Sequence, residues 1–217
     1  MNISAWRTRP ARMYVPRPTH FLALPLNHVP GLQAAVRAIQ TDLVGCVPSL
    51  APTLVDPASL HITLGVLSLQ GEEACREVAD VAHAVLHAAT PPAPSITLTG
   101  LSDFNHRVLY WDLVPDAGRR SLVRLADLLE QGLVQRGLMQ PSRRPFTPHL
   151  TLAKVPPASP RLRQAQAPRD VPAEAYSANM GATYGPILLS QLQLCAMRGR
   201  LPGCYYPTLF ELSLDGA

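Results

Sequence analysis

Apolar residues recur along the chain with two different periods, and these periods predict its helices and strands. Residues 32–43, 72–88 and 119–136 carry apolar side chains three or four positions apart, which is the spacing of a helix with one buried face. Other segments combine alternating apolar positions with β-branched residues and are predicted to be strands: residues 19–26, 59–69, 96–101, 107–113, 146–155, 187–198 and 205–214. This mixture of helices and strands indicates an α+β fold.

Two segments lack this periodicity and are rich in proline. Residues 1–18 also carry several arginines, and we expect them to form a leader or linker ahead of a single domain over residues 19–217. Residues 156–172 are expected to form a surface loop, because their prolines interrupt both helix and strand.

Composition narrows the class of protein. Hydrophobic residues make up 47% of the chain, enough to bury a core, yet no apolar run approaches the roughly 18 residues of a membrane-spanning helix. The four cysteines form no C-x-x-C pair and no secretory signal is present, so a reduced cytoplasmic or nuclear protein is expected. The net charge is +4, and all 19 basic residues except Lys154 are arginine. Arginine suits phosphate oxygens, although a base-composition bias in the gene would produce the same pattern.

One short motif, His–apolar–Thr–apolar, occurs twice, as HITL at residues 61–64 and as HLTL at residues 149–152. Residues i and i+2 of a strand point to the same face, about 6.5–7 Å apart. His61 and Thr63 should therefore project together, as should His149 and Thr151, while the aliphatic residues between them enter the core. The alternative for each motif alone is a half-buried strand histidine beside a threonine.

Two such pairs facing each other across a groove would suit in-line phosphoryl transfer. One histidine can accept a proton from the attacking group while the other donates one to the leaving oxygen, because the imidazole pKa of about 6.5 lies near working pH. The threonine hydroxyls can donate hydrogen bonds to phosphoryl oxygens as charge develops there. The scheme requires neither a metal nor another cofactor, and the seven histidines form no metal-ligand pattern.

The paired motifs resemble those of the 2H phosphoesterase superfamily. The segments RPTHFLALPL, LHITLGVL and FTPHLTLAKV resemble the group containing the central domain of A-kinase anchor protein 7. The final GCYYPTLFEL adds a closer resemblance to C-terminal domains of the leukocyte receptor cluster member 9 type. The resemblance implies a bilobal fold of two pseudo-symmetric lobes, with antiparallel sheets flanked by helices around a central cleft. It also implies catalytic roles for His61, Thr63, His149 and Thr151.

Activities of that superfamily include opening 2′,3′-cyclic phosphates and cleaving 2′,5′-linked oligonucleotides, and some members bind nucleotides such as AMP. The function expected here is therefore metal-independent hydrolysis of such bonds at the ends of RNA or oligonucleotides, by a protein that is monomeric. The alternative is a module that binds a nucleotide or RNA end without turnover.

Further residues are weaker candidates for binding the substrate. Strand alternation predicts that Lys154 lies opposite the face of Thr151, as a solvated residue. His20 is expected to face the cleft or to pack in the first strand. The remaining candidates each have a plainer alternative role in an exposed loop or in packing: Arg143, Arg144, Phe146, Tyr205 and Tyr206.

Overall fold

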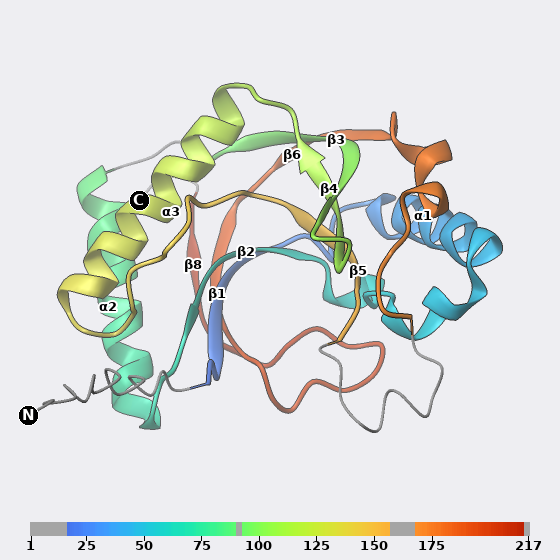
Figure 1. Ribbon diagram of the computed structural model, residues 1–217. Coiled ribbons are helices and arrows are strands. Elements are labelled where there is room, and N and C mark those ends of the chain that lie inside the picture. The colour runs from blue at the N-terminus through green and yellow to red at the C-terminus, as the bar shows by residue number, and fades with distance from the viewer. Residues whose placement is uncertain (1–16, 90–92, 157–167, 215–217) are drawn as a thin grey trace, which may run out of the picture.

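The computed structural model describes residues 17–89, 93–156 and 168–214, and Figure 1 shows how its elements are arranged. The helices are α1 (Leu32–Cys46), α2 (Gly71–Ala89) and α3 (Ala117–Gln135). The strands are β1 (His20–Pro25), β2 (His61–Leu67), β3 (Ser95–Phe104), β4 (Val108–Leu113), β5 (Leu150–Lys154), β6 (Thr183–Leu188), β7 (Gln191–Ala196) and β8 (Thr208–Ser213). Short 3₁₀ turns occupy Pro48–Thr53, Pro57–Ser59, Ala173–Ala175 and Ser177–Asn179.

The strands form two four-stranded antiparallel sheets, one per lobe. The first has the order β2-β1-β7-β8 and the second the order β5-β4-β3-β6. In Figure 1, α2 and α3 lie together on one side of the sheets and α1 lies on the other. The predicted α+β class, with two antiparallel sheets flanked by helices, is confirmed.

The buried faces of the helices follow the predicted apolar stripes. In α1 the buried residues are Leu32, Val36, Ile39, Gln40 and Leu43, and all but Gln40 are aliphatic. In α3 the side chain of Asp116 accepts a hydrogen bond from the Arg119 amide and caps the helix N-terminus. The three helices match the predicted periods, although α1 runs three residues further than expected.

The prediction of one strand over residues 187–198 is wrong. That segment contains the end of β6 and all of β7, which belong to different sheets. Between them the Leu189 amide donates to the Pro94 carbonyl, and the Ser190 carbonyl accepts from Leu214. Apolar periodicity does not reveal where a chain crosses between sheets; here only Ser190 and Gln191 interrupt the apolar positions at the crossing. The first part of β6 contains Gly185 and Pro186, which a sheet tolerates here because β6 is an edge strand.

The predicted strand over residues 146–155 is shorter in the structure, where β5 begins at Leu150. Pro145 and Pro148 lack the amide hydrogens that a strand ladder would use, so the preceding residues approach the sheet without joining it. The predicted leader falls almost wholly outside the described residues, as does most of the predicted loop over residues 156–172.

Candidate active site

The two histidine motifs lie on strands at the edges of the two sheets, and these strands contact each other. His61 is the first residue of β2, and His149 immediately precedes β5. Both strands occupy the end position in their sheet, and β2 touches β5 across the junction of the lobes. The fold therefore brings together two motifs that are far apart in the sequence.

Each motif strand contains a bulge directly after its threonine. In its pairing with β1, β2 skips Leu64, and in its pairing with β4, β5 skips Leu152. The skipped residue is buried in both strands. A bulge of this kind shifts the alternation of side chains by one position. The two halves of the site thus share a local distortion as well as a sequence motif.

The bulges return the third residue after each threonine to the threonine's own face. Val66 in β2 and Lys154 in β5 are both exposed, and both line the same cavity as Thr63 and Thr151. The prediction that Lys154 lies opposite the Thr151 face is therefore wrong, because it assumed unbroken alternation. The structure places the ammonium-bearing side chain on the cavity side.

Both histidines are held by the same backbone hydrogen bond. The Nδ1 atom of His61 lies 2.7 Å from the Ser59 carbonyl oxygen, and that of His149 lies 2.7 Å from the Thr147 carbonyl oxygen. A carbonyl oxygen only accepts, so Nδ1 carries the hydrogen in each ring. The neutral imidazole then presents an unprotonated Nε2, which is the atom free to exchange a proton with a ligand.

Burial lowers the pKa of both imidazoles. For His61, burial is the main cause, the hydrogen bond to Ser59 opposes it, and the charge of His149 adds to it. For His149, burial again dominates; the Thr147 carbonyl and Asp112 raise the pKa, and Lys154 lowers it. The neutral, proton-accepting form is thus favoured, and a bound anion would favour protonation.

Aromatic rings from other strands and loops pack around each histidine. Phe21 in β1 lies 4.9 Å from the His61 ring, and Tyr206 meets the same ring edge-on at 5.6 Å. On the other side, Phe104 and Tyr110 lie 5.0 and 5.2 Å from the His149 ring. Phe21 and Tyr110 belong to the strands next to the two motif strands, so the packing follows the two-fold arrangement of the lobes.

A cavity of about 330 Å³ opens beside these groups. Its lining comprises Phe21, Val55, Ser59, Leu60, His61, Thr63, Val66, Thr151, Lys154, Met197 and Tyr206. Three of the four predicted catalytic residues are in this set; the fourth, His149, packs against Phe104 and Tyr110 instead. The volume lies at the lower end of the roughly 300–1,000 Å³ typical of small-ligand sites.

Several of the weaker candidates lie elsewhere. His20 lines a separate cavity of about 430 Å³ with Cys75 of α2, so the prediction that it faces the cleft is wrong. Alternation explains this, because its neighbour Phe21 faces His61. Arg143, Arg144 and Phe146 line a third hollow of about 340 Å³ with acidic residues of α3.

The two adjacent tyrosines lie on the His61 side. Tyr206 lines the cavity, whereas the hydroxyl of Tyr205 is buried, and burial together with the nearby Cys195 raises the pKa of Tyr205. Sequence reasoning missed Phe21, Phe104 and Tyr110, although Phe21 could have been found from its place in the strand before the first motif. It also missed the carbonyls of Ser59 and Thr147, which no side-chain pattern could indicate.

The described residues contain neither a cluster of side chains suited to a metal ion nor a helix suited to spanning a membrane. No group of three or more His, Cys, Asp or Glu side chains in residues 17–89, 93–156 and 168–214 is placed to hold a metal ion. Within the same ranges, no helix has both the length and the apolar character needed to cross a membrane.

Solved structures of other proteins share this fold at low sequence identity. E. coli LigT complexed with 3'-AMP is 22% identical with a TM-score of 0.58, covering 90% of this chain and 97% of that one. The protein TT0787 of Thermus thermophilus is 23% identical with a TM-score of 0.59, covering 91% and 98%. The MHV ns2 PDE domain is 16% identical with a TM-score of 0.54, covering 83% and 99%. These likenesses establish the fold alone.

Sequence comparison is more specific. Human A-kinase anchor protein 7 isoform gamma is 24% identical over 188 residues, which cover 83% of this chain and 52% of the relative. The chain thus spans about half the length of this curated relative. The family described as AKAP7 2'5' RNA ligase-like domain matches residues 18–214. The finer resemblance to leukocyte receptor cluster member 9 stays a prediction. The chain therefore belongs to the AKAP7 2'5' RNA ligase-like domain family, within the 2H phosphoesterase superfamily.

Proposed function

We propose that the protein is a metal-independent phosphodiesterase that hydrolyses 2′,3′-cyclic phosphates or 2′,5′-phosphodiester bonds at the ends of RNA or oligonucleotides. The observation that carries this proposal is the equivalence of the two histidines. Each is oriented by an Nδ1 hydrogen bond to the carbonyl two residues before it, and each precedes by two positions a threonine that lines the cavity. Binding alone has no need of two proton-transfer groups held alike in contacting strands.

The proton path follows from this arrangement. The Nε2 atom of one histidine accepts a proton from the attacking water as its oxygen bonds to phosphorus. The protonated Nε2 of the other donates its proton to the ribose oxygen as the phosphorus–oxygen bond breaks. The nucleophile and leaving oxygen lie on opposite sides of phosphorus, which matches two groups on different sheets. Each turnover exchanges the protonation states of the pair, and solvent restores them.

The phosphate is held by the threonines and Lys154. Thr63 and Thr151 are half-buried, and their hydroxyls donate to the non-bridging oxygens as negative charge develops. Lys154 reaches the same cavity through the bulge in β5 and supplies a positive charge.

The nucleoside is placed on the His61 side of the cavity. Phe21, Val66, Met197 and Tyr206 form an apolar wall there, whereas Thr151 and Lys154 form the polar side. Nucleobases stack on aromatic side chains regardless of their identity, so this wall suits a ligand end with a base attached. A relative of the same fold has been crystallised with 3'-AMP, which supports a ligand of this class.

The test uses purified protein in EDTA with two substrates: an RNA ending in a 2′,3′-cyclic phosphate, and 2′,5′-linked oligoadenylate. The variants are His61→Ala and His149→Ala, with His28→Ala as a matched control because His28 is an exposed histidine distant from the motifs in sequence. We expect turnover of at least one substrate, reduced about 10²–10⁴-fold in each motif variant and unchanged in the control.

The outcomes separate the alternatives. Turnover that survives either motif variant would contradict the mechanism. Turnover that disappears in EDTA and returns with a divalent cation would contradict metal independence. Absence of turnover in the wild type, with 3′-AMP still bound, would instead favour a nucleotide- or RNA-end-binding module.

A further inference from the structure

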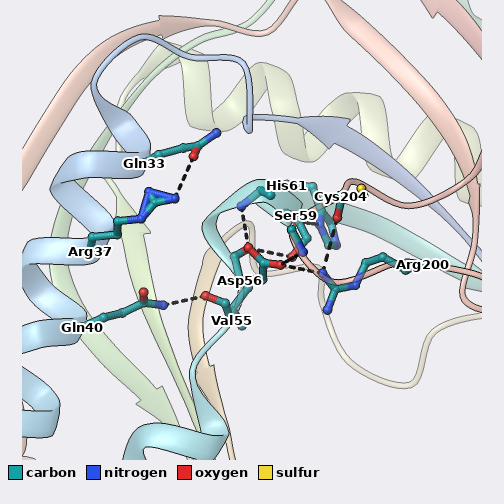
Figure 2. A network of polar contacts seen from close by, with 11 residues as sticks. Gln33, Arg37, Gln40, Val55, Asp56, Ser59, His61, Arg200 and Cys204 are labelled. Atoms are coloured by element: carbon teal, nitrogen blue, oxygen red, sulfur yellow. Dashed lines mark hydrogen bonds and ion pairs between the residues drawn. The ribbon is translucent and has the colours of Figure 1, made fainter.

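An ion pair and a hydrogen bond connect the loop between β7 and β8 to the segment that precedes β2. The Nη1 atom of Arg200 lies 3.1 Å from the Oδ2 atom of Asp56, and the Gly203 amide donates to the same oxygen at 2.9 Å. Figure 2 shows Arg200 and Asp56 meeting next to Ser59 and His61. Two segments separated by 144 residues are thereby joined beside the first histidine motif.

The same aspartate organises the support of His61. Its Oδ1 atom accepts from the Ala58 amide at 3.0 Å, and its backbone carbonyl accepts from the amide and hydroxyl of Ser59. The Ser59 carbonyl in turn accepts the hydrogen bond from Nδ1 of His61. Burial would raise the pKa of Asp56, but the amides of Ala58 and Gly203 and the charge of Arg200 outweigh it and lower the pKa. Asp56 therefore stays ionised and can hold its three partners, the amides of Ala58 and Gly203 and the guanidinium of Arg200.

Arg200 also touches the wall of the cavity. Its guanidinium carbon lies 5.3 Å from the centre of the Tyr206 ring, within the range of a cation–π contact. The Tyr206 ring stands edge-on to Phe21 at 4.9 Å and to His61 at 5.6 Å. A single arginine thus contacts both Asp56 and the ring that faces the ligand space.

The segment before the second histidine motif differs from the segment before the first. The residue five positions before His61 is Asp56, whereas the residue five positions before His149 is Arg144, which lines the separate hollow beside α3. The Arg200–Asp56 connection therefore breaks the two-fold symmetry of the site and distinguishes the His61 side.

We propose that Arg200, which Asp56 holds in place, is a positioning residue that fixes Tyr206 as the surface against which the ligand's nucleobase packs. This inference rests on the proposed function and deepens it by assigning base recognition to a preorganised loop. Holding an aromatic side chain in its bound orientation beforehand removes the ordering cost from binding. Arg200 should accordingly affect ligands that carry a base and not the phosphate group by itself.

The test compares two probes by calorimetric titration, 3′-AMP and inorganic phosphate, which share the anion but differ in the base. The variants are Arg200→Ala and Arg200→Lys, with Arg198→Ala as the control because Arg198 is an exposed arginine of the same loop. We expect Arg200→Ala to weaken 3′-AMP binding about tenfold, because part of the affinity contributed by stacking one base is lost. Phosphate binding should change less than about twofold, since phosphate makes no stacking contact.

Arg200→Lys keeps the charge but not the planar fork, so we expect it to recover part of the 3′-AMP affinity. Equal weakening of both probes would overturn the inference, because Arg200 would then act on the anion or on the fold. An Arg200→Ala variant that behaves like Arg198→Ala would overturn it as well, while leaving the proposed function intact. A wild-type protein that neither binds 3′-AMP nor turns over either substrate would overturn both.

Discussion

At the scale of single residues, the tautomer of each histidine is set by a backbone carbonyl. Nδ1 of His61 and of His149 donates to the carbonyl oxygen of the residue two positions earlier, which leaves Nε2 as the ring atom that can exchange a proton with a ligand. Burial lowers both pKa values, so in the proposed reaction each imidazole acts more easily as a base than as an acid. In the same proposal, the acid is the histidine that a bound phosphate keeps protonated.

The lowered pKa values also predict how stability depends on pH. The unfolded chain binds protons at its histidines as the pH falls through about 6.5, before the folded protein does. Stability contributed by the neutral buried imidazoles is therefore present above that pH and lost below it. Urea unfolding at pH 7.5 and 5.5 should show a larger loss for the wild type than for the His61→Ala/His149→Ala variant. An equal loss in both proteins would contradict the lowered pKa values.

The threonines make a second residue-scale prediction. Replacing Thr63 or Thr151 with valine removes a hydroxyl donor while keeping the branched shape. If each hydroxyl stabilises charge that develops only in the transition state, kcat should fall about 10²-fold with little change in KM. Serine at the same position keeps the donor and should retain most of the rate. Steady-state kinetics showing a raised KM with an unchanged kcat would assign the hydroxyls to ground-state binding instead.

At the scale of elements, the bulges in β2 and β5 decide which side chains share the cavity. If β5 had no bulge at Leu152, simple alternation would turn Lys154 away from Thr151. The sequence predicted both strands, and it predicted that His61 and Thr63 project together, which agrees with their shared place in the cavity lining. It could not predict the bulge, because HLTLAK fits an unbroken strand equally well and the irregularity appears only in the pairing with β4.

The bulge makes Lys154 testable as a phosphate contact. Lys154→Gln removes the charge and should raise KM about tenfold, whereas Lys154→Arg should raise it much less. Because the contact is electrostatic, the difference between wild type and Lys154→Gln should shrink as salt is added. A difference that does not respond to salt would indicate that Lys154 acts by packing.

A buried glutamine of α1 hydrogen-bonds to the backbone near both histidine motifs. Gln40 of α1 is 5% exposed, and its side-chain amide donates to the carbonyls of Val55 at 2.7 Å and Leu152 at 3.1 Å. Val55 lies on the approach to β2, and Leu152 lies in β5. One helix side chain thus bonds to the backbone beside both motifs.

Gln40→Leu should lower the free energy of unfolding by about 1–3 kcal/mol, because the carbonyls of Val55 and Leu152 each lose a hydrogen bond and Leu152 keeps only the bond from the Val55 amide. Gln33→Leu is the matched control, since Gln33 donates to a single carbonyl, that of Asn27, at the start of the same helix. Chemical denaturation of both variants measures the difference. Equal losses would contradict a special role for Gln40.

At the scale of the whole molecule, the proposed catalysis depends on the place where two edge strands, β2 and β5, meet. Apolar periodicity predicted the helices and most strands, and the repeated motif predicted the candidate catalytic residues. The crossing from β6 to β7 was missed because apolar runs carry no information about which sheet a strand joins. The Arg200–Asp56 pair was missed because nothing local to either residue indicates a partner 144 positions away.

The central claim is that the two lobes contribute to one reaction centre, and a double-mutant cycle on kcat/KM tests it most directly. His61→Ala, His149→Ala and the double variant are compared with the wild type in EDTA, on whichever substrate the wild type cleaves. If both histidines act in a single displacement, the double variant should be little slower than the worse single variant. Independent losses that multiply in the double variant would show that the two histidines do not act as a unit, and would contradict the account.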